Sequence, residues 1–498
     1  MLQAIPESDV EKALQAHGAN CDAILRAIAH RRGARRHPPA DLPAYLSLSA
    51  AEPWHHDVYR RFHDIIDTPV FDYISKTKRG WLIVGDRRAE IAARILLVVE
   101  HYGLGVGMMV LHAHQMRAQH IPMEIFENGQ TQSLCGPTER LHGSRRESVL
   151  YVPVRRFRTN PARLAQLNIA KPRGLWDASR IVSHEKDGNP CFYCSAAEIN
   201  PSEVIIDIPA ARLGLSRNYS LGFTYAPFGN PVRVLHFLAW DCAENPFNMS
   251  RTPMTISDLV GMTRHINVSI RDFFAGTGIE APVVDGISNG WAGNSIYHQH
   301  FQFFRAEYPP PITDATLLSP EPLLVRDDVQ ISRVSWETPV YKISADDSVN
   351  VGIVGNDIAG AWRLDGGRAK VEYRKFREGY VPVDSDKVPV HTQNLYVPGR
   401  YLGKEVYFIL RDKRKIDYEP RRKDFVDGGR KYRSQPKKNI GVLEATGTMI
   451  VDDYRSFEQM KNWEPRNISV QIDNMAHAIS PDPNRVAKLE RTIQDLFQ

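Results

Sequence analysis

The segment from Gly293 to Phe304 constrains the fold more than any other part of the chain, and it reads Gly-Asn-Ser-Ile-Tyr-His-Gln-His-Phe-Gln-Phe-Phe. Its β-branched and aromatic residues favour a strand. Because side chains alternate between the two faces of a strand, His298, His300 and Gln302 are expected to share one face. The preceding turn, Gly293 to Ser295, can offer backbone N–H groups at the end of that face.

Two imidazoles and a carboxamide on one strand face suit attack on a phosphorus atom. Imidazole is a good nucleophile near neutral pH and a good leaving group from a phosphoramidate. Neighbouring N–H groups and the amide of Gln302 can hold phosphoryl oxygens as charge redistributes. The sequence therefore predicts phosphoryl-transfer chemistry on a partly exposed strand face, with a purely structural polar strand as the alternative.

Five residues, Gly293, Ser295, His298, His300 and Gln302, match a known signature in register. The segment resembles the His-x-His-x-Gln motif of the histidine-triad superfamily, in its transferase branch. That branch includes galactose-1-phosphate uridylyltransferase, GDP-hexose phosphorylases and diadenosine tetraphosphate phosphorylase. The resemblance implies that the second histidine of the motif carries the nucleotidyl group.

The implied reaction has two steps. His300 would attack the α-phosphorus of a nucleotide sugar or dinucleoside polyphosphate, and phosphate or a sugar phosphate would then displace the nucleotidyl group. Gly293, Asn294 and Ser295 would position the phosphate. Gln302 stands where the hydrolase branch has a third histidine, and a carboxamide cannot exchange protons at neutral pH, which favours transfer over hydrolysis. A nucleotide hydrolase and a non-catalytic nucleotide-binding or adaptor protein remain the alternatives.

A Cys-x-x-Cys pair, Cys191 and Cys194, can supply two thiolates to a tetrahedral metal. In the transferase branch such a pair shares a structural zinc with a later histidine and with the first histidine of the motif, here His298. Cys242 stands at the expected place of the later histidine, and His236 is the fallback ligand. The resemblance thus implies a closed zinc site, whereas the alternative is three small buried cysteines.

The chain has 498 residues, of which 42% are hydrophobic and 24% charged, as in a globular protein of roughly three domains. It contains no apolar run of about 20 residues for a membrane span and no signal-peptide pattern at its N-terminus. Its five cysteines, an odd and sparse count, argue against a disulfide scaffold. We therefore expect a cytoplasmic protein with no membrane partner.

The formal net charge is +5, and residues 411–438 hold twelve Lys or Arg against five acids. Such a cluster can attract phosphates or anionic polymers, although a solvated loop with paired acids has the same composition. No aromatic-rich single-strand binding pattern accompanies it, so nucleic acid is not expected as a partner. The assembly stays open between a monomer and a homodimer.

The fold class predicted for the chain is α+β. Strands, a helix from Thr255 to Phe274 and the motif strand match the half-barrel layout of a histidine-triad domain. A looser resemblance covers a second repeat without the motif. The resulting domains are a short helical segment (1–36), an N-terminal region of unknown type (44–160), a catalytic histidine-triad-like repeat (165–312) and a degenerate second repeat with a C-terminal helix (320–498).

Local patterns add three expectations. Thr255 and Asp258 have the spacing of a capping box at the start of the long helix. His112 and His114 form a second His-x-His, but without the Gly-x-Ser prefix or a matching Gln, so we interpret it as unrelated to the site. The run Gly-Leu-Gly-Val-Gly from Gly103 does not have the spacing of a dinucleotide fingerprint.

Overall fold

The structure is a computed structural model. The residues that it describes are 53–66, 74–77, 80–83, 87–119, 124–127, 130–133, 154–157, 163–167, 204–223, 235–241, 255–289, 300–305, 309–314, 321–366, 391–412, 424–427, 430–433, 441–451 and 479–496. The predicted helical segment over 1–36 lies outside them.

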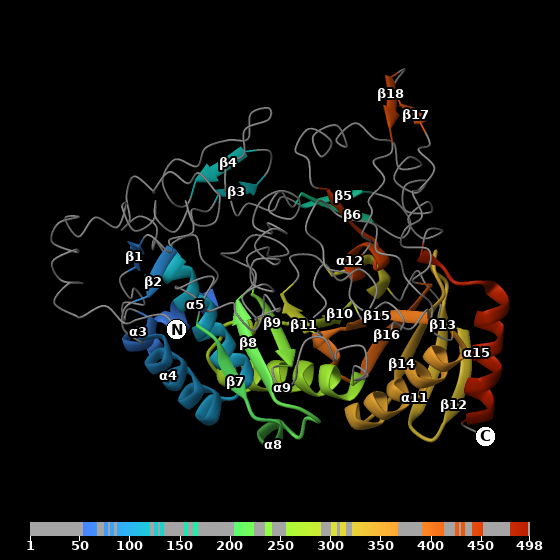
Figure 1. The fold of residues 1–498 in the computed structure, drawn as a ribbon, viewed down its shortest axis with the longest axis horizontal. Helices are drawn as coiled ribbons and strands as arrows, with labels where there is room; N and C mark the ends of the chain where they lie inside the picture. The colour runs from blue at the N-terminus through green and yellow to red at the C-terminus, as the bar shows by residue number, and fades with distance from the viewer. Residues whose placement is uncertain are drawn as a thin grey trace.

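A ten-stranded antiparallel sheet is the central feature of these residues (Figure 1), in the order β12-β13-β14-β16-β15-β10-β11-β9-β8-β7. In chain order its strands are β7 (Ile206–Ile208), β8 (Tyr219–Phe223), β9 (His236–Asp241), β10 (Asp285–Ser288), β11 (His300–Phe304), β12 (Glu321–Arg326), β13 (Val329–Val334), β14 (Val340–Ser344), β15 (His391–Val397) and β16 (Glu405–Asp412).

The two halves of this sheet have the same connectivity. The first unit comprises β7, β8, β9, the helix α9 (Ile256–Phe274), β10 and β11, and the second comprises β12, β13, β14, the helix α11 (Ser348–Gly366), β15 and β16. In both units the strand before the helix pairs with the last strand of the unit. The units are joined where β10 pairs with β15, with Gly286 opposite Val397. We call this pairing the seam.

Helices α9 and α11 lie along one face of the sheet and pack against each other (Figure 1). Alternate residues of the central strands supply the apolar surface beneath them, including the fully buried Phe301 and Phe303 of β11 and Phe408 of β16. The two helices approach closely at Gly352, where a Cβ atom would lie 2.8 Å from Cα of Ser257. The helices therefore cover the face opposite to the one that carries His300 and Gln302.

Three N-terminal helices flank the first unit: α3 (Pro53–Ile66), α4 (Arg87–Tyr102) and α5 (Leu104–Gln119). Gly103, between α4 and α5, has a φ of 91°, which favours glycine. At Gly105 a Cβ atom would lie 2.2 Å from the carbonyl oxygen of Ile266 on α9. The glycines from Gly103 thus serve the junction and close packing of helices, as expected for a run that is not a nucleotide fingerprint.

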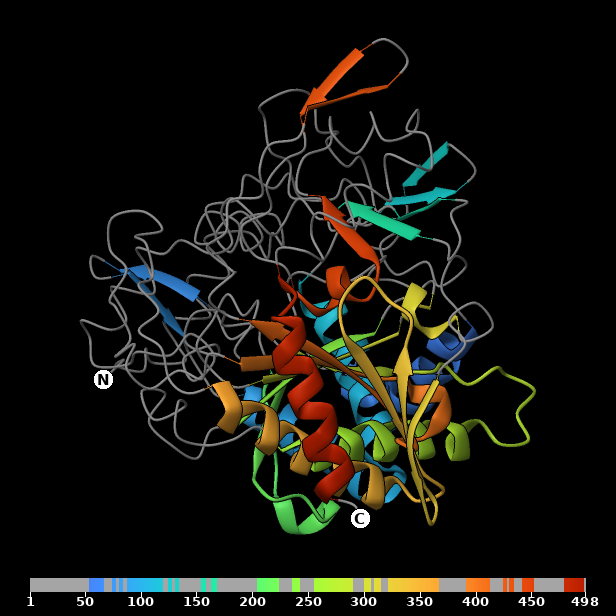
Figure 2. The same ribbon diagram turned by 90° about the vertical axis from the view of Figure 1, so that its right-hand side faces the viewer.

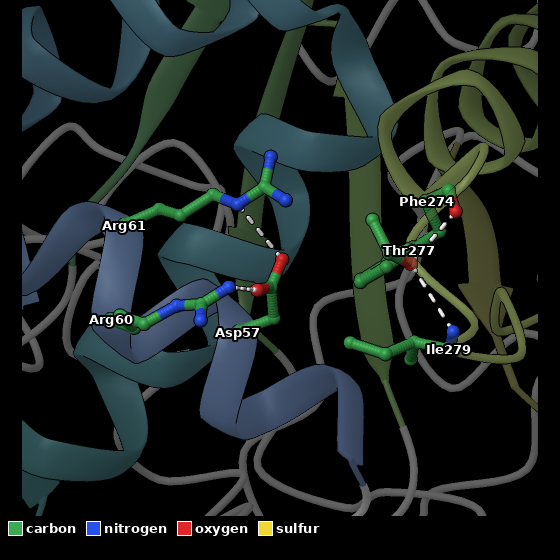
Figure 3. Close-up of polar contacts among 6 residues, drawn as sticks. All are labelled: Asp57, Arg60, Arg61, Phe274, Thr277 and Ile279. Atoms are coloured by element: carbon green, nitrogen blue, oxygen red, sulfur yellow. Dashed lines mark hydrogen bonds and ion pairs between the residues drawn. The ribbon is translucent and has the colours of Figure 1, made fainter.

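Cation–π and aromatic contacts attach α3 to α9, and ion pairs within α3 hold one of the contacting side chains. Asp57 forms ion pairs with Arg60 and Arg61, the latter with an Nε to Oδ2 distance of 2.9 Å (Figure 3). The Arg61 guanidinium lies 4.4 Å from the ring centre of Phe273, a cation–π distance. Phe62 stacks on the same ring, with 6.0 Å between ring centres.

Thr277 caps the C-terminal end of α9. Its Oγ1 donates to the carbonyl of Phe274 at 2.8 Å and accepts from the backbone N–H of Ile279 at 3.2 Å (Figure 3). The Phe274 carbonyl, which the helix leaves without an internal partner, also accepts from the backbone N–H of Thr277 at 3.1 Å.

Helix α15 (Pro483–Leu496) packs against α11 and β12 at the far edge of the sheet (Figure 2). Its Glu490 accepts from Arg333 Nη2 at 2.6 Å and from the Tyr341 hydroxyl at 2.8 Å. The predicted C-terminal helix is therefore confirmed, and it belongs to the edge of the second unit. No helix within the described ranges is long and apolar enough to cross a bilayer.

The remaining elements are smaller. They are the hairpins β1 (Ile74–Thr77) with β2 (Gly80–Ile83), β3 (Glu124–Glu127) with β4 (Gln130–Ser133) and β17 (Asp424–Asp427) with β18 (Arg430–Arg433), the sheet β5 (Val154–Phe157), β6 (Arg163–Leu167) and β19 (Thr448–Val451), the helices α8 (Ala210–Leu213) and α12 (Val442–Ala445), and the 3-10 turns η4 (Pro311–Thr313) and η6 (Gly399–Tyr401).

The capping-box prediction at α9 is wrong. Thr255 precedes the helix, but no side-chain cap hydrogen bond forms there. Asp258 instead accepts from the backbone N–H of Ser216 at 2.8 Å and from the Tyr219 hydroxyl at 2.7 Å. The Asp258 carboxylate therefore connects α9 to the loop before β8, and a tertiary contact has replaced the local capping contact.

The α+β class is confirmed, with one correction. The strands form one continuous ten-stranded sheet in place of separate half-barrel sheets. Strand β19 lies outside this sheet and pairs in parallel with β6.

Candidate active site

Strand β11 lies inside the sheet, between β9 and β10. Its register places His300 opposite Trp240 and Gln302 opposite Leu238. On its other side, Gln302 is opposite Ile287 of β10. The predicted alternation is therefore confirmed for the described part of the motif: His300 and Gln302 share one face, and Phe301 and Phe303 point to the helices.

The face that carries these residues is less open than predicted. His300 is only 5% exposed, and Gln302 is partly buried. The expectation of a partly exposed nucleophile is wrong for His300, because its strand has a neighbour on each side and large side chains such as Trp240 beside it. A buried imidazole is shielded from bulk water.

Gln302 is in contact with two histidines. Its Oε1 is 3.2 Å from Nε2 of His236 on β9, and its Nε2 is 3.5 Å from Nε2 of His300. His236 is 1% exposed, and its ring meets that of Phe304 edge to face at 5.9 Å between centres. His236, Gln302 and His300 thus form a continuous line of polar side chains across two paired strands, which we call the histidine–glutamine row.

Several predicted site residues lie outside the described residues. They are the phosphate-positioning residues Gly293, Asn294 and Ser295 and the predicted metal ligands Cys191, Cys194, Cys242 and His298. Their assignments stay predictions. Within the described ranges, no group of three or more His, Cys, Asp or Glu side chains is placed to hold a metal ion.

The fallback metal ligand, His236, is the first residue of β9, whereas Asp241 is the last and Cys242 follows it in the sequence. At about 3.3 Å per residue, the two ends of the strand are roughly 17 Å apart. His236 also faces Gln302 through its Nε2 atom. Cys242 and His236 therefore belong to opposite ends of β9 in the sequence.

A buried polar network continues across the seam on the same sheet face. Arg411 of β16 donates to Asn394 Oδ1 at 2.7 Å, and Asn394 Nδ2 donates to the carbonyl of Asn289 at 2.9 Å. Asn289 Oδ1 in turn accepts from the backbone N–H of Val442 at 2.7 Å. Burial lowers the pKa of Arg411 to about 9. Sequence patterns did not identify this network, since its members come from separate strands with no local motif.

Asp285, also on this face, is held by the second unit. Its carboxylate accepts from the Tyr396 hydroxyl at 2.7 Å and from the backbone N–H of Gly399 at 2.8 Å. Burial raises its pKa to about 6, against the opposing effect of these hydrogen bonds and of the nearby Arg400. Asp285 is therefore a titratable group of the seam.

The second His-x-His is part of the core. His112 and His114 lie in α5 and are fully buried. On a helix, residues two apart point in different directions, so they cannot form the paired face of a strand motif. Burial lowers the pKa of His114 to about 4, which keeps this imidazole neutral. In the described structure the pair therefore contributes to the packing of the core.

Neither a protein-family model nor a curated protein matches the sequence. Among solved structures, the chain is similar to yeast Ap4A phosphorylase Apa2, with 10% identity and a TM-score of 0.35 over 65% of this chain and 89% of the other. It is also similar to a DUF4931 family protein from Bacillus cereus, with 10% identity and a TM-score of 0.23 over 36% of this chain and 76% of the other. Similarities of this size assign neither a family nor an activity.

Proposed function

We propose that the protein is a nucleotidyltransferase or phosphorylase of the histidine-triad type. Its substrate would be a nucleotide sugar or a dinucleoside polyphosphate. The observation that carries the proposal is the position of His300 and Gln302 on one face of β11, with the amide nitrogen of Gln302 turned toward Nε2 of His300. A nucleophile and a neutral hydrogen-bond donor side by side match the needs of a phosphoryl group under attack.

In the first step the lone pair of His300 Nε2 forms a bond to the α-phosphorus, and the bond from phosphorus to the bridging oxygen breaks. The leaving group departs as a phosphate or phosphorylated fragment. In the second step an oxygen of phosphate or a sugar phosphate attacks the same phosphorus, and the nitrogen–phosphorus bond breaks. Gln302 donates to a phosphoryl oxygen but cannot remove a proton from water, so an acceptor that is already anionic is favoured.

We also propose that the two units are histidine-triad-like repeats, the second without catalytic residues. The identical order of strands and helix in the two units supports this. Strand β16 takes the place of β11 in the second unit, and its sequence Glu-Val-Tyr-Phe-Ile-Leu-Arg-Asp contains no histidine. The predicted division into a catalytic repeat (165–312) and a degenerate repeat (320–498) is compatible with this arrangement.

A structural zinc bound by Cys191, Cys194, Cys242 and His298 is part of the proposal. Three thiolates and one imidazole are donors that zinc prefers in closed tetrahedral sites. Strands β9 and β11 are antiparallel, and His300 at the start of β11 is opposite Trp240 near the end of β9. Cys242 follows the end of β9 in the sequence, and His298 precedes the start of β11, so both are adjacent in sequence to the same end of this strand pair. This arrangement supports the choice of ligands. A bound zinc would fix the start of the motif strand and would leave His300 free to react.

The test is incubation with nucleotides labelled at the α-phosphate, first diadenosine tetraphosphate and then UDP-, GDP- and ADP-sugars, followed by denaturing electrophoresis. We expect a covalent, acid-labile label on the wild type and none on His300→Ala. Discharge of the label by phosphate or a sugar phosphate identifies a transferase, whereas discharge by water alone identifies the hydrolase alternative. Binding of these nucleotides without any label would contradict the proposal and support the binding-protein alternative.

A further inference from the structure

We infer that His236 is a positioning residue that fixes the orientation of the Gln302 carboxamide toward the reacting atoms. This inference rests on the proposed function and adds to it a residue that lies on a different strand, 66 positions away in sequence from Gln302. The row of side chains from His236 through Gln302 to His300 carries the argument.

A carboxamide has two unlike ends, and its orientation decides what it offers to His300. The carbonyl oxygen can only accept a hydrogen bond, and the NH₂ group can only donate. Because Oε1 of Gln302 faces Nε2 of His236 at 3.2 Å, that ring nitrogen must be the donor and carry a hydrogen. The other end of the amide, Nε2, then points toward His300.

This orientation has two consequences for the nucleophile. An N–H group aimed at Nε2 of His300 matches an unprotonated nitrogen, so the lone pair needed for attack is on the atom that faces the site. The separation of 3.5 Å is long for a hydrogen bond, so little is lost when that lone pair turns to phosphorus. The same N–H can then meet a phosphoryl oxygen.

The opposite orientation of the Gln302 carboxamide would hinder attack by His300. The carbonyl oxygen would face His300, favour the tautomer with a hydrogen on Nε2 and repel an incoming phosphoryl oxygen. His236 prevents this because it is buried and held against the ring of Phe304. Its donor therefore stays in place while the substrate binds and leaves.

The experiment is a double-mutant cycle between His236→Phe, which keeps an aromatic ring without a donor, and Gln302→Leu. The rate of covalent label formation is measured in single turnovers with α-labelled diadenosine tetraphosphate, or with the nucleotide sugar that labels the wild type best. Loss of one positioning hydrogen bond should slow His236→Phe about tenfold, with little change in the nucleotide concentration at half-maximal rate. His236→Gln, which restores an N–H donor, should recover most of the rate.

If His236 acts through Gln302, then adding His236→Phe to Gln302→Leu should cause no further slowing. Melting temperatures of all variants separate this result from a loss of folded protein. A fully additive cycle, or a rate loss that follows the melting temperature, would overturn the role of His236 while the labelling of wild type still upholds the proposed function. An unlabelled wild type would overturn both.

Discussion

The two units of the sheet share their connectivity but differ in the side chains at corresponding places. In the first unit the last strand, β11, presents His300 and Gln302 on the face away from the helices. In the second unit β16 presents Tyr407 and Ile409 on that face, and both are buried in an apolar cluster with Tyr396. The comparison teaches that one strand order can carry different side chains on the corresponding strand, and under the proposed function these side chains restrict catalysis to the first unit.

The largest expected effect contrasts the corresponding strands β11 and β16. His300→Ala should reduce turnover by several orders of magnitude, since removal of a covalent nucleophile has effects of this size. Tyr407→Phe on β16 should leave turnover within about threefold, because a single buried hydroxyl in a scaffold unit contributes little to the barrier. The measurement is the steady-state rate of each variant, and the melting temperature of each variant must match that of the wild type. Activity above about one percent in His300→Ala would end the assignment of the nucleophile.

The next prediction concerns the metal, which is proposed for the first unit only. We expect one zinc per chain in protein purified without chelators, and none in the double variant Cys191→Ser and Cys194→Ser. The melting temperature should fall, because loss of a structural metal removes several kcal/mol of folding free energy. Metal analysis and thermal denaturation measure the two effects. A zinc-free wild type would refute the site.

The third prediction concerns Asp285 at the seam between the units. Its folded pKa of about 6 lies above the ordinary value of 3.8, so folding favours the protonated carboxyl. The stability linked to this group is present below pH 4 and is lost as pH rises through 6, by ~3 kcal/mol at most. Asp285→Asn should remove that fall in stability.

Denaturant unfolding of wild type and Asp285→Asn between pH 4 and 7 checks this pH dependence. Asp495→Asn, at an exposed position of α15, is the matched control and should follow the wild type. Parallel curves for wild type and Asp285→Asn would show that the seam does not titrate in this range.

The smallest expected effect separates transfer from hydrolysis within the first unit. Gln302→His should raise hydrolysis of the nucleotidyl intermediate relative to transfer a few-fold, because an imidazole with a pKa near 6.5 can exchange a proton with water. Partitioning of the labelled intermediate between water and phosphate gives the ratio, with Gln302→Asn as a control that keeps an amide. If the ratio does not change, Gln302 does not set the reaction type.

The contrast between the units also explains what the sequence could predict. The alternation in β11 and the amphipathic stripe of α9 are local patterns, and they predicted the strand face and the helix correctly. Helix α11 was not predicted, because its sequence contains glycines that pack against α9 and shows little separation of polar and apolar faces. The contact of His236 with Gln302 depends on strand register, which no local pattern reveals.

The single pairing that joins the two units also bears on how the chain folds. Within each unit most strand pairs connect neighbouring segments of the sequence, whereas Gly286 must find Val397 across more than a hundred residues. Contacts between residues so far apart in the sequence form slowly, because the long segment between them must first be closed into a loop. Until then the unpaired edge of β10, a strand buried on both faces, is open to association with other chains. A truncated chain that ends before β15 would keep that edge permanently, and we expect it to aggregate.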